Sequence, residues 1–156
     1  MTETYSGRCL CGAIEMQGLG EASVAQCHCD MCQHWHGGPS ISANFSGGIE
    51  ITKGDDTIGW FKSSDWAERG FCKTCGSTLF YRLLDGSILM GEAGSFDMPK
   101  GLSVTEHYFI DEKPDYYDVT DDAPKLTGAE VFAKYATDQE DAPQCLILFK
   151  TISPNV

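Results

Sequence analysis

Two short cysteine motifs decide how this chain folds: Arg8-Cys9-Leu10-Cys11-Gly12 near its start and Phe71-Cys72-Lys73-Thr74-Cys75-Gly76 near its middle. Between them lies a third motif, Cys27-His28-Cys29-Asp30-Met31-Cys32. The three motifs hold seven of the eight cysteines in a chain of 156 residues. The eighth, Cys145, stands in an apolar run, and we interpret it as a buried thiol that packs as a small hydrophobe.

The spacing of the cysteines favours metal binding over disulfide bonds. Cysteines separated by one residue pair poorly, because a disulfide fixes both the Cα separation and the direction of the Cβ vectors. The first residues include Glu3 and have neither the basic start nor the apolar core of a signal peptide, so we expect a cytoplasmic protein with reduced thiols. Clustered thiolates bind soft tetrahedral metals, among which zinc is the default.

The motifs divide by the number of sulfurs they supply. The C-x-C and C-x2-C pairs supply four, which completes a closed structural zinc site. Its predicted ligands are Cys9, Cys11, Cys72 and Cys75. The C-x-C-x2-C motif supplies three, so we predict that Cys27, Cys29 and Cys32 hold a second, catalytic zinc with one position free for water or substrate. Two zinc ions per chain are expected, the second being lost more readily.

Two other interpretations of the middle motif stay open. Cys29-Asp-Met-Cys32 matches the C-x-x-C of thioredoxin-like proteins, but no strand followed by a long helix surrounds it, and Cys27 has no role there. An iron–sulfur cluster is the other interpretation, and it lacks a fourth cysteine at a suitable spacing.

The hydrophobic pattern predicts a mainly β protein with few short helices. Residues 40–46 alternate apolar and polar side chains, which is typical of a half-buried strand. The expected strands are 13–17, 40–46, 49–52, 57–62, 68–72, 78–83, 88–92, 104–110 and 144–152. Helices are expected only at 30–35 and 129–135, the second after the capping box Thr127-Gly-Ala-Glu130. We expect one domain over residues 1–156.

Charge limits the partners. The chain has 23 acidic and 11 basic residues and a net charge of −12, which argues against binding to nucleic acid or to an anionic membrane surface. No run approaches the roughly 18 apolar residues that a membrane span needs. Residues 111–141 hold ten acids and three lysines. We expect this segment to form a solvated surface, with a partner-binding face as the alternative.

In the order of its cysteine motifs, the chain resembles the glutathione-dependent formaldehyde-activating enzyme family. The neighbouring stretches 6–14, 27–39, 63–76 and 107–117 agree as well, so the resemblance covers about residues 5–125. It implies a β-tent fold of twisted antiparallel sheets pinned by the structural zinc. The implied activity joins formaldehyde to glutathione, which is formally a carbon–sulfur lyase reaction run in reverse. The alternative is a non-catalytic, zinc-stabilised module that binds glutathione or a protein partner.

Side chains near the motifs supply further candidates. A new alkoxide needs a proton, and His36 is the candidate donor together with His34, although their position also suits ordinary packing histidines. His28 lies between two ligands, so we expect it to point away from the metal and assign it no role. Trp35, Trp60 and Trp66 are candidates for a substrate pocket or for the core. The candidates for holding substrate carboxylates are Arg8, Arg69, Lys73 and Arg82.

Overall fold

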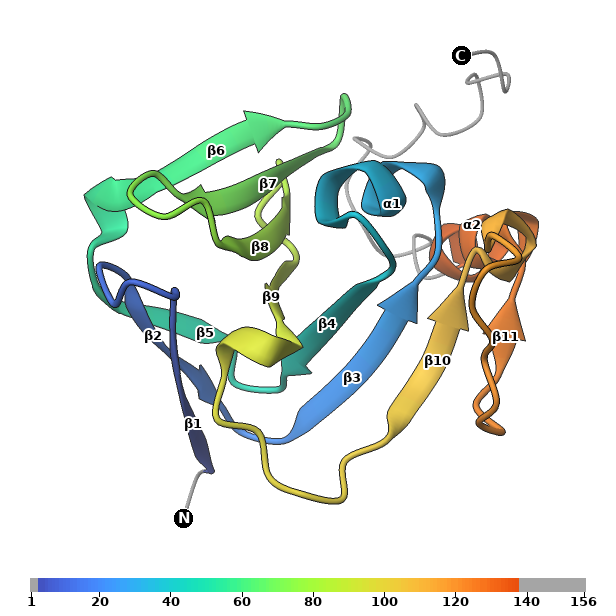
Figure 1. Ribbon diagram of the computed structural model, residues 1–156, viewed down its shortest axis with the longest axis horizontal. Coiled ribbons are helices and arrows are strands. Elements are labelled where there is room, and N and C mark those ends of the chain that lie inside the picture. The colour runs from blue at the N-terminus through green and yellow to red at the C-terminus, as the bar shows by residue number, and fades with distance from the viewer. Residues whose placement is uncertain (1–2, 138–156) are drawn as a thin grey trace.

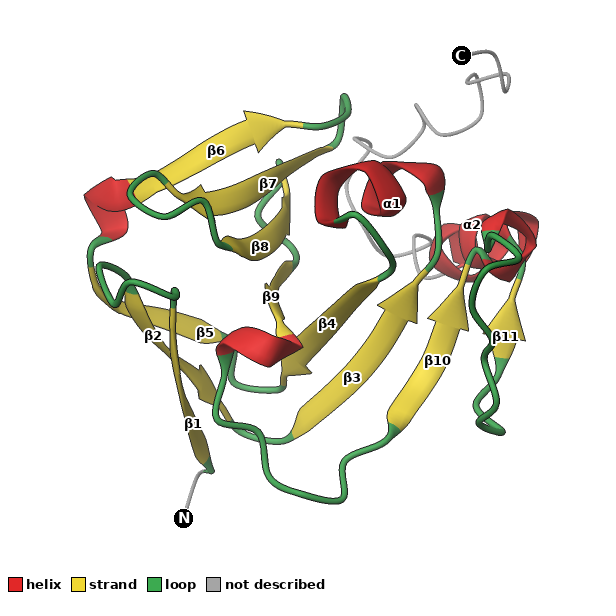
Figure 2. Ribbon diagram, viewed as in Figure 1, coloured by secondary structure: helices red, strands yellow, loops and turns green. Residues whose placement is uncertain are grey.

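Strands dominate the computed structural model, which describes residues 3–137 (Figure 2). Eight of the nine expected strands and both expected helices are present, each within two residues of its predicted ends. The ninth expected strand, 144–152, and Cys145 lie outside the described residues. The prediction of a mainly β fold is therefore confirmed. No helix in residues 3–137 is long and apolar enough to cross a membrane.

The strands form two sheets. The smaller has the order β1-β2-β5, and the larger has the order β11-β10-β3-β4-β9-β8-β7-β6. The strands of the smaller sheet are β1 (Thr4–Arg8), β2 (Glu15–Leu19) and β5 (Ile49–Lys53). Those of the larger are β3 (Ala22–Cys27), β4 (Ser40–Phe45), β6 (Ile58–Lys62), β7 (Ala67–Cys72), β8 (Thr78–Leu83), β9 (Leu89–Glu92), β10 (Val104–Tyr108) and β11 (Lys125–Leu126).

The larger sheet turns at β9. Strands β4 and β9 share only two register pairs, Ser42 with Glu92 and Ala43 with Gly91, so the sheet is narrow there. Figure 1 shows the result: β6, β7 and β8 form one group, β3, β4 and β10 another, and β1, β2 and β5 a third. The helices α1 (Asp30–His36) and α2 (Gly128–Thr137) follow β3 and β11, and three short 3-10 turns join strands.

The expectation of purely antiparallel sheets is wrong for β10. This strand runs parallel to both β3 and β11. Parallel neighbours need a crossover rather than a tight turn, and the chain reaches β10 only after passing through β4 to β9. Three strands had not been predicted: β1, β3 and β11. Of these, β3 reads Ala-Ser-Val-Ala-Gln-Cys, whose small side chains give little hydrophobic alternation.

The core includes two of the predicted metal ligands. Cys9 and Cys72 are 1% and 0% exposed and pack in one cluster with Ile14, Leu79 and Phe80. The sulfur cluster therefore borders the main apolar core, and residues from both sheets meet at it.

The described part of the acidic segment, residues 111–137, is mostly exposed, but three of its acids make hydrogen bonds to the backbone. Asp111 accepts a hydrogen bond from the Gly128 amide at 2.8 Å, and Glu112 accepts one from the Asp30 amide at 2.7 Å. Glu130 accepts from the Thr127 amide at 2.7 Å and completes the predicted capping box of α2. These acids thus attach residues 111–130 to the two helices.

Glycine is required where the backbone of the smaller sheet meets aromatic rings. A Cβ on Gly18 would lie 2.4 Å from the ring of Phe45, which is 7% exposed and packs against Phe96 with centroids 4.8 Å apart. Two further glycines, Gly7 and Gly91, make the same kind of contact with Phe96 at 2.7 and 2.4 Å. Close packing of the Phe45 and Phe96 rings therefore requires glycine, which has no side chain, at these neighbouring positions.

We predict that Gly18→Ala lowers the free energy of unfolding by about 1–3 kcal/mol, because the added methyl group overpacks the core around Phe45. Urea denaturation measures this change. Gly94→Ala is the matched control, since its Cβ would meet nothing within 4 Å, and we expect it to change stability by less than about 0.5 kcal/mol. Equal stabilities for the two variants would contradict the packing argument.

Candidate metal centres

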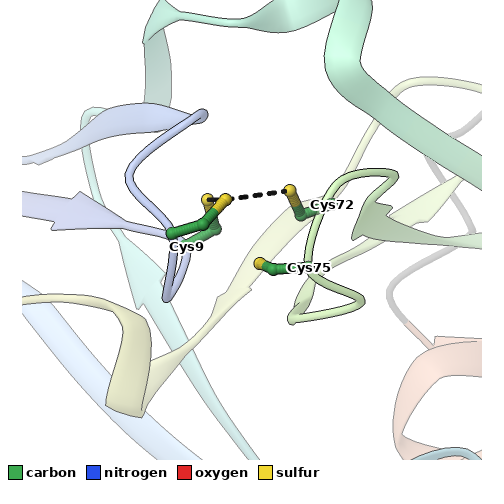
Figure 3. Close-up of side chains that lie close together, drawn as sticks. Cys9, Cys72 and Cys75 are labelled. Carbon is green, nitrogen blue, oxygen red and sulfur yellow. Dashed lines mark hydrogen bonds between the residues drawn. The ribbon is translucent and has the colours of Figure 1, made fainter.

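Two loops bring four sulfurs to one point. The β1–β2 loop carries Cys9 and Cys11, and the β7–β8 turn carries Cys72 and Cys75. All four Sγ atoms lie within 4.8 Å of one another. Cys9 and Cys11 are 3.5 Å apart, and Cys11 and Cys72 are 3.9 Å apart. Figure 3 shows the side chains converging from the two loops.

Glycines and hydrogen-bond donors position the backbone of these loops around the sulfur atoms. Gly12 and Gly76 have φ values of 73° and 75°, in the left-handed region that favours glycine. The Ile14 amide donates to Cys9 Sγ at 3.3 Å. At Cys75, hydrogen bonds from the Ser77 hydroxyl and amide lower the pKa of the thiol to about 5. A donor set that stabilises thiolate in a group of four suits a tetrahedral divalent cation.

The second cluster lies where β3 meets α1. Cys27 ends β3, Cys29 caps α1, and Cys32 lies within the helix. The Cys32 amide donates to Cys29 Sγ at 3.4 Å, which is a helix cap made by sulfur. The three Sγ atoms lie within 4.8 Å of one another. Among residues 3–137, no fourth His, Cys, Asp or Glu joins this group.

Protonation of the three thiols is uneven. Hydrogen bonds from Cys27 and Cys32 lower the pKa of Cys29 to about 3. The same bond with Cys29 raises the pKa of Cys27 far above its ordinary value. Three adjacent sulfurs thus hold one negative charge in common, and all three become thiolates only when a cation balances them. Both donor sets fit a soft metal ion, and the expected zinc suits each of them.

A cleft lies against α1, the helix that contains Cys32, although none of the three triad cysteines is among its lining residues. It has a volume of about 300 Å³. Its lining residues are Asp30, Met31, His34, Trp35, Phe61, Ser63 and Arg69. Trp35 stacks on Phe61 with centroids 5.7 Å apart and rings 10° from parallel. Of the three tryptophans proposed for a pocket, only Trp35 lines this cleft, since Trp60 stacks on Phe80 and Trp66 is not a lining residue.

The two candidate proton donors differ in placement. The ring of His34 is 79% exposed and lies 3.3 Å from Asp30. His36 is 10% exposed and lies one helical turn beyond Cys32, with Nε2 3.4 Å from Glu92 Oε1. That approach lacks hydrogen-bond geometry, so His36 Nε2 has no bonded partner in the described part of the chain. Only His36 is therefore buried beside the cluster.

Burial disfavours the charged form of both members of the His36–Glu92 pair. It lowers the pKa of His36 to about 4 and raises the pKa of Glu92 to about 7. Ser40 Oγ donates to Glu92 Oε2 at 3.3 Å, which offsets part of the effect on the carboxyl. The carboxyl of Glu92 therefore titrates close to neutral pH, whereas His36 gains a proton only in acid. Glu92 was not recognised from the sequence, where nothing distinguishes it from an exposed strand residue.

A buried hydrogen-bonded chain runs behind the triad. His28 Nδ1 lies 2.7 Å from Tyr117 Oη, and His28 Nε2 lies 3.1 Å from His107 Nδ1. His107 Nε2 lies 3.0 Å from the carboxylate of Asp121. A carboxylate only accepts, so each ring nitrogen has a fixed role: His107 donates to Asp121, His28 donates to His107, and Tyr117 donates to His28. Gln33 Nε2 completes the chain by donating to Tyr117.

This chain fixes the backbone between two of the triad cysteines. Both imidazoles are 0% exposed, and burial lowers the pKa of His28 to about 4. The His28 ring is bonded to Tyr117 and His107, in agreement with the expectation that it turns away from the cysteines. His107, Tyr117 and Asp121 were missed, because 79 and 89 residues separate His28 from two of its partners.

The four basic residues proposed to hold substrate carboxylates differ in their surroundings. Arg82 pairs with Glu68 at 2.5 Å and stacks on Trp60, with Cζ 3.6 Å from the ring centroid. Arg8 donates to the Leu10 carbonyl at 3.2 Å. Lys73 is exposed. Arg69 is 4% exposed and donates to Cys32 Sγ at 3.7 Å.

Fold and cysteine geometry together define a class: mainly β proteins with two separate sulfur clusters that could each hold a metal ion. The chain belongs to the family "Glutathione-dependent formaldehyde-activating enzyme", whose pattern matches residues 4–112. A Schizosaccharomyces pombe protein named as an uncharacterized lyase is 31% identical over 129 residues, which span 81% of this chain and 93% of that protein. A Rhodobacter sphaeroides protein of known crystal structure is similar with a TM-score of 0.46 and 20% identity, over 63% of this chain and 90% of that one. The resemblance drawn from the motifs is confirmed.

We predict that Glu92→Gln removes a pH dependence of stability. Above pH 4.5 the unfolded carboxyl ionises, whereas the folded one stays protonated up to about pH 7, so Glu92 costs stability as the pH rises through this window. The variant should gain up to about 3 kcal/mol over the wild type between pH 4.5 and pH 8. Urea unfolding of both proteins at each pH measures the difference, and metal effects common to both cancel. A difference that does not change with pH would contradict the assignment.

Proposed function

We propose that this protein is a zinc-dependent enzyme of the carbon–sulfur lyase type that acts on the adduct of a small thiol with formaldehyde, S-(hydroxymethyl)glutathione being the leading candidate. The observation that carries the proposal is the triad of Cys27, Cys29 and Cys32, which offers three sulfurs at the start of α1, a helix that also lines a cleft. Family membership and the lyase-named relative support the same class of reaction.

The two clusters have different proposed roles. Cys9, Cys11, Cys72 and Cys75 hold a structural zinc that ties the two loops together. The triad holds the second zinc, which when bound lowers the pKa of a substrate thiol so that it reacts as a thiolate. The chain of Tyr117, His28, His107 and Asp121 keeps the triad segment in place from behind.

The cleft accounts for binding of the thiol. Its volume of about 300 Å³ falls at the lower end of the range of small-molecule sites. Met31 and Phe61 are 42% and 53% exposed and form, with Trp35, an apolar wall for the carbon chain of the ligand. The His36–Glu92 pair is the proposed proton store for the alkoxide that forms when sulfur attacks formaldehyde.

The remaining expectations belong to this proposal. Residues 1–156 make up one zinc-binding domain, the protein works in the cytoplasm, and its partner is a small thiol rather than nucleic acid or membrane. Binding of glutathione without faster adduct formation would favour the alternative, a non-catalytic zinc-stabilised module.

We predict that Cys29→Ser stays folded and keeps one metal ion per chain. Its turnover should fall at least about 100-fold, because the two sulfurs that remain in the triad are too few to hold the second ion. Metal analysis, circular dichroism and the rate of S-(hydroxymethyl)glutathione formation above the spontaneous rate measure the three effects. Cys145→Ser makes the same chemical change outside the motifs and should keep both ions and full turnover. Unchanged turnover in Cys29→Ser would overturn the proposal.

A further inference from the structure

Arg69 is a buried cation that makes no ion pair with an Asp or Glu of residues 3–137, although its charge acts at longer range on Glu92 and on the Cys29 thiol. It lies in the middle of β7, between Phe61 on β6 and Tyr81 on β8. Its side chain is almost fully enclosed, and no Asp or Glu of residues 3–137 lies within 4.0 Å of its nitrogens. A guanidinium has five N–H donors, and here one of them bonds to Cys32 Sγ at 3.7 Å while Cζ lies 5.3 Å from the Tyr81 ring centroid.

A buried arginine ordinarily has an acidic side chain as its partner, because an uncompensated buried charge is strongly destabilising. Arg82 shows such pairing at a partly exposed site: its side chain is 41% exposed, and Glu68 binds both its Nε and its Nη2. Arg69 instead lines the cleft together with Trp35 and Phe61. A ligand in the cleft therefore lies next to Arg69, in a protein whose net charge is −12.

The distance to Cys32 limits what that ligand group is. A charge-assisted hydrogen bond to a guanidinium is about 2.7–2.9 Å long, so an acceptor on Arg69 Nη2 lies within about 7 Å of Cys32 Sγ. In a hydroxymethyl thioether, one carbon separates the oxygen from the sulfur. The carboxylates of glutathione are many bonds from its sulfur. The short reach therefore suits the oxygen at the reacting carbon, which one bond joins to the carbon that carries the sulfur.

We infer that Arg69 is a catalytic residue that binds the carbonyl oxygen of formaldehyde and the alkoxide it becomes. This inference rests on the proposed function. The substrate thiolate attacks the carbonyl carbon, the carbon–sulfur bond forms, and the π electron pair moves to the oxygen held by Arg69. The proton lost by the thiol is replaced on that oxygen, which gives the hydroxymethyl thioether; the reverse sequence breaks the same bond. Charge develops on oxygen only along the reaction, so Arg69 acts on the transition state more than on the bound thiol.

The test compares Arg69→Met with Arg69→Lys, and uses Arg82→Met as the matched control because Arg82 already has a carboxylate partner. In the metal-loaded protein, Arg69→Met should lower kcat by about 10²–10³-fold, the range seen when one oxyanion donor is removed. The KM for glutathione should change less than about 3-fold, since uniform binding is retained. Arg69→Lys, which keeps the charge without the fork, should recover part of kcat.

Binding of formate, a planar oxyanion of the size of formaldehyde, provides a readout that does not depend on turnover. Titration followed by tryptophan fluorescence should show that Arg69→Met weakens formate binding at least 10-fold, while Arg82→Met binds as the wild type does.

Three outcomes would contradict this account. Loss of the second metal ion from Arg69→Met, with Arg69→Lys retaining it, would overturn the inference and make Arg69 a counter-charge for the triad. Unchanged kcat and formate affinity would overturn it as well. A wild type without turnover would sink the proposed function, and the formate comparison would then still decide whether Arg69 binds an oxyanion.

Discussion

Convergence of four sulfurs from two distant loops is the constraint on which the rest of the structure depends. Cys11 and Cys72 are 61 residues apart in sequence and 3.9 Å apart in space. They join the loop of the smaller sheet to the turn between β7 and β8. Because Cys9 and Cys72 also belong to the apolar core, a metal ion bound by the four sulfurs would stabilise the same arrangement that core packing does.

Strand β7 carries this constraint to the second site. Cys72 ends the strand at the four-sulfur cluster, and Arg69 lies three residues earlier, against Cys32 of the triad. Trp35 of α1 packs edge-on against Phe71 of the same strand, with centroids 6.1 Å apart. The end of β7 at the four-sulfur cluster and its middle at the cleft are thus parts of one strand, so the position of Cys72 bears on the position of Arg69. The hydrogen-bonded chain from Gln33 to Asp121 holds α1 from the opposite side.

Local patterns predicted much of this, and tertiary pairing accounts for what they missed. Ligand spacing divided the cysteines into groups of four and three, and the period of two located β4 within a residue of its ends. Strand β3 was not predicted, because its small side chains show little alternation between apolar and polar residues. The parallel placement of β10, the burial of Glu92 and the bond between His28 and His107 depend on segments far apart in the chain. The four basic candidates looked alike until Arg82 was found paired and Arg69 was not.

Sulfur coordination of the bound metal tests the central claim most directly, namely that one cluster is closed and the other is open. X-ray absorption at the zinc edge, on protein loaded with two ions per chain, reports the average ligand set. Seven sulfurs shared by two ions give an average of about three and a half sulfurs per zinc, with a lighter oxygen or nitrogen ligand at the remaining position. An average of four sulfurs, or a single ion per chain under saturating zinc, would contradict the account.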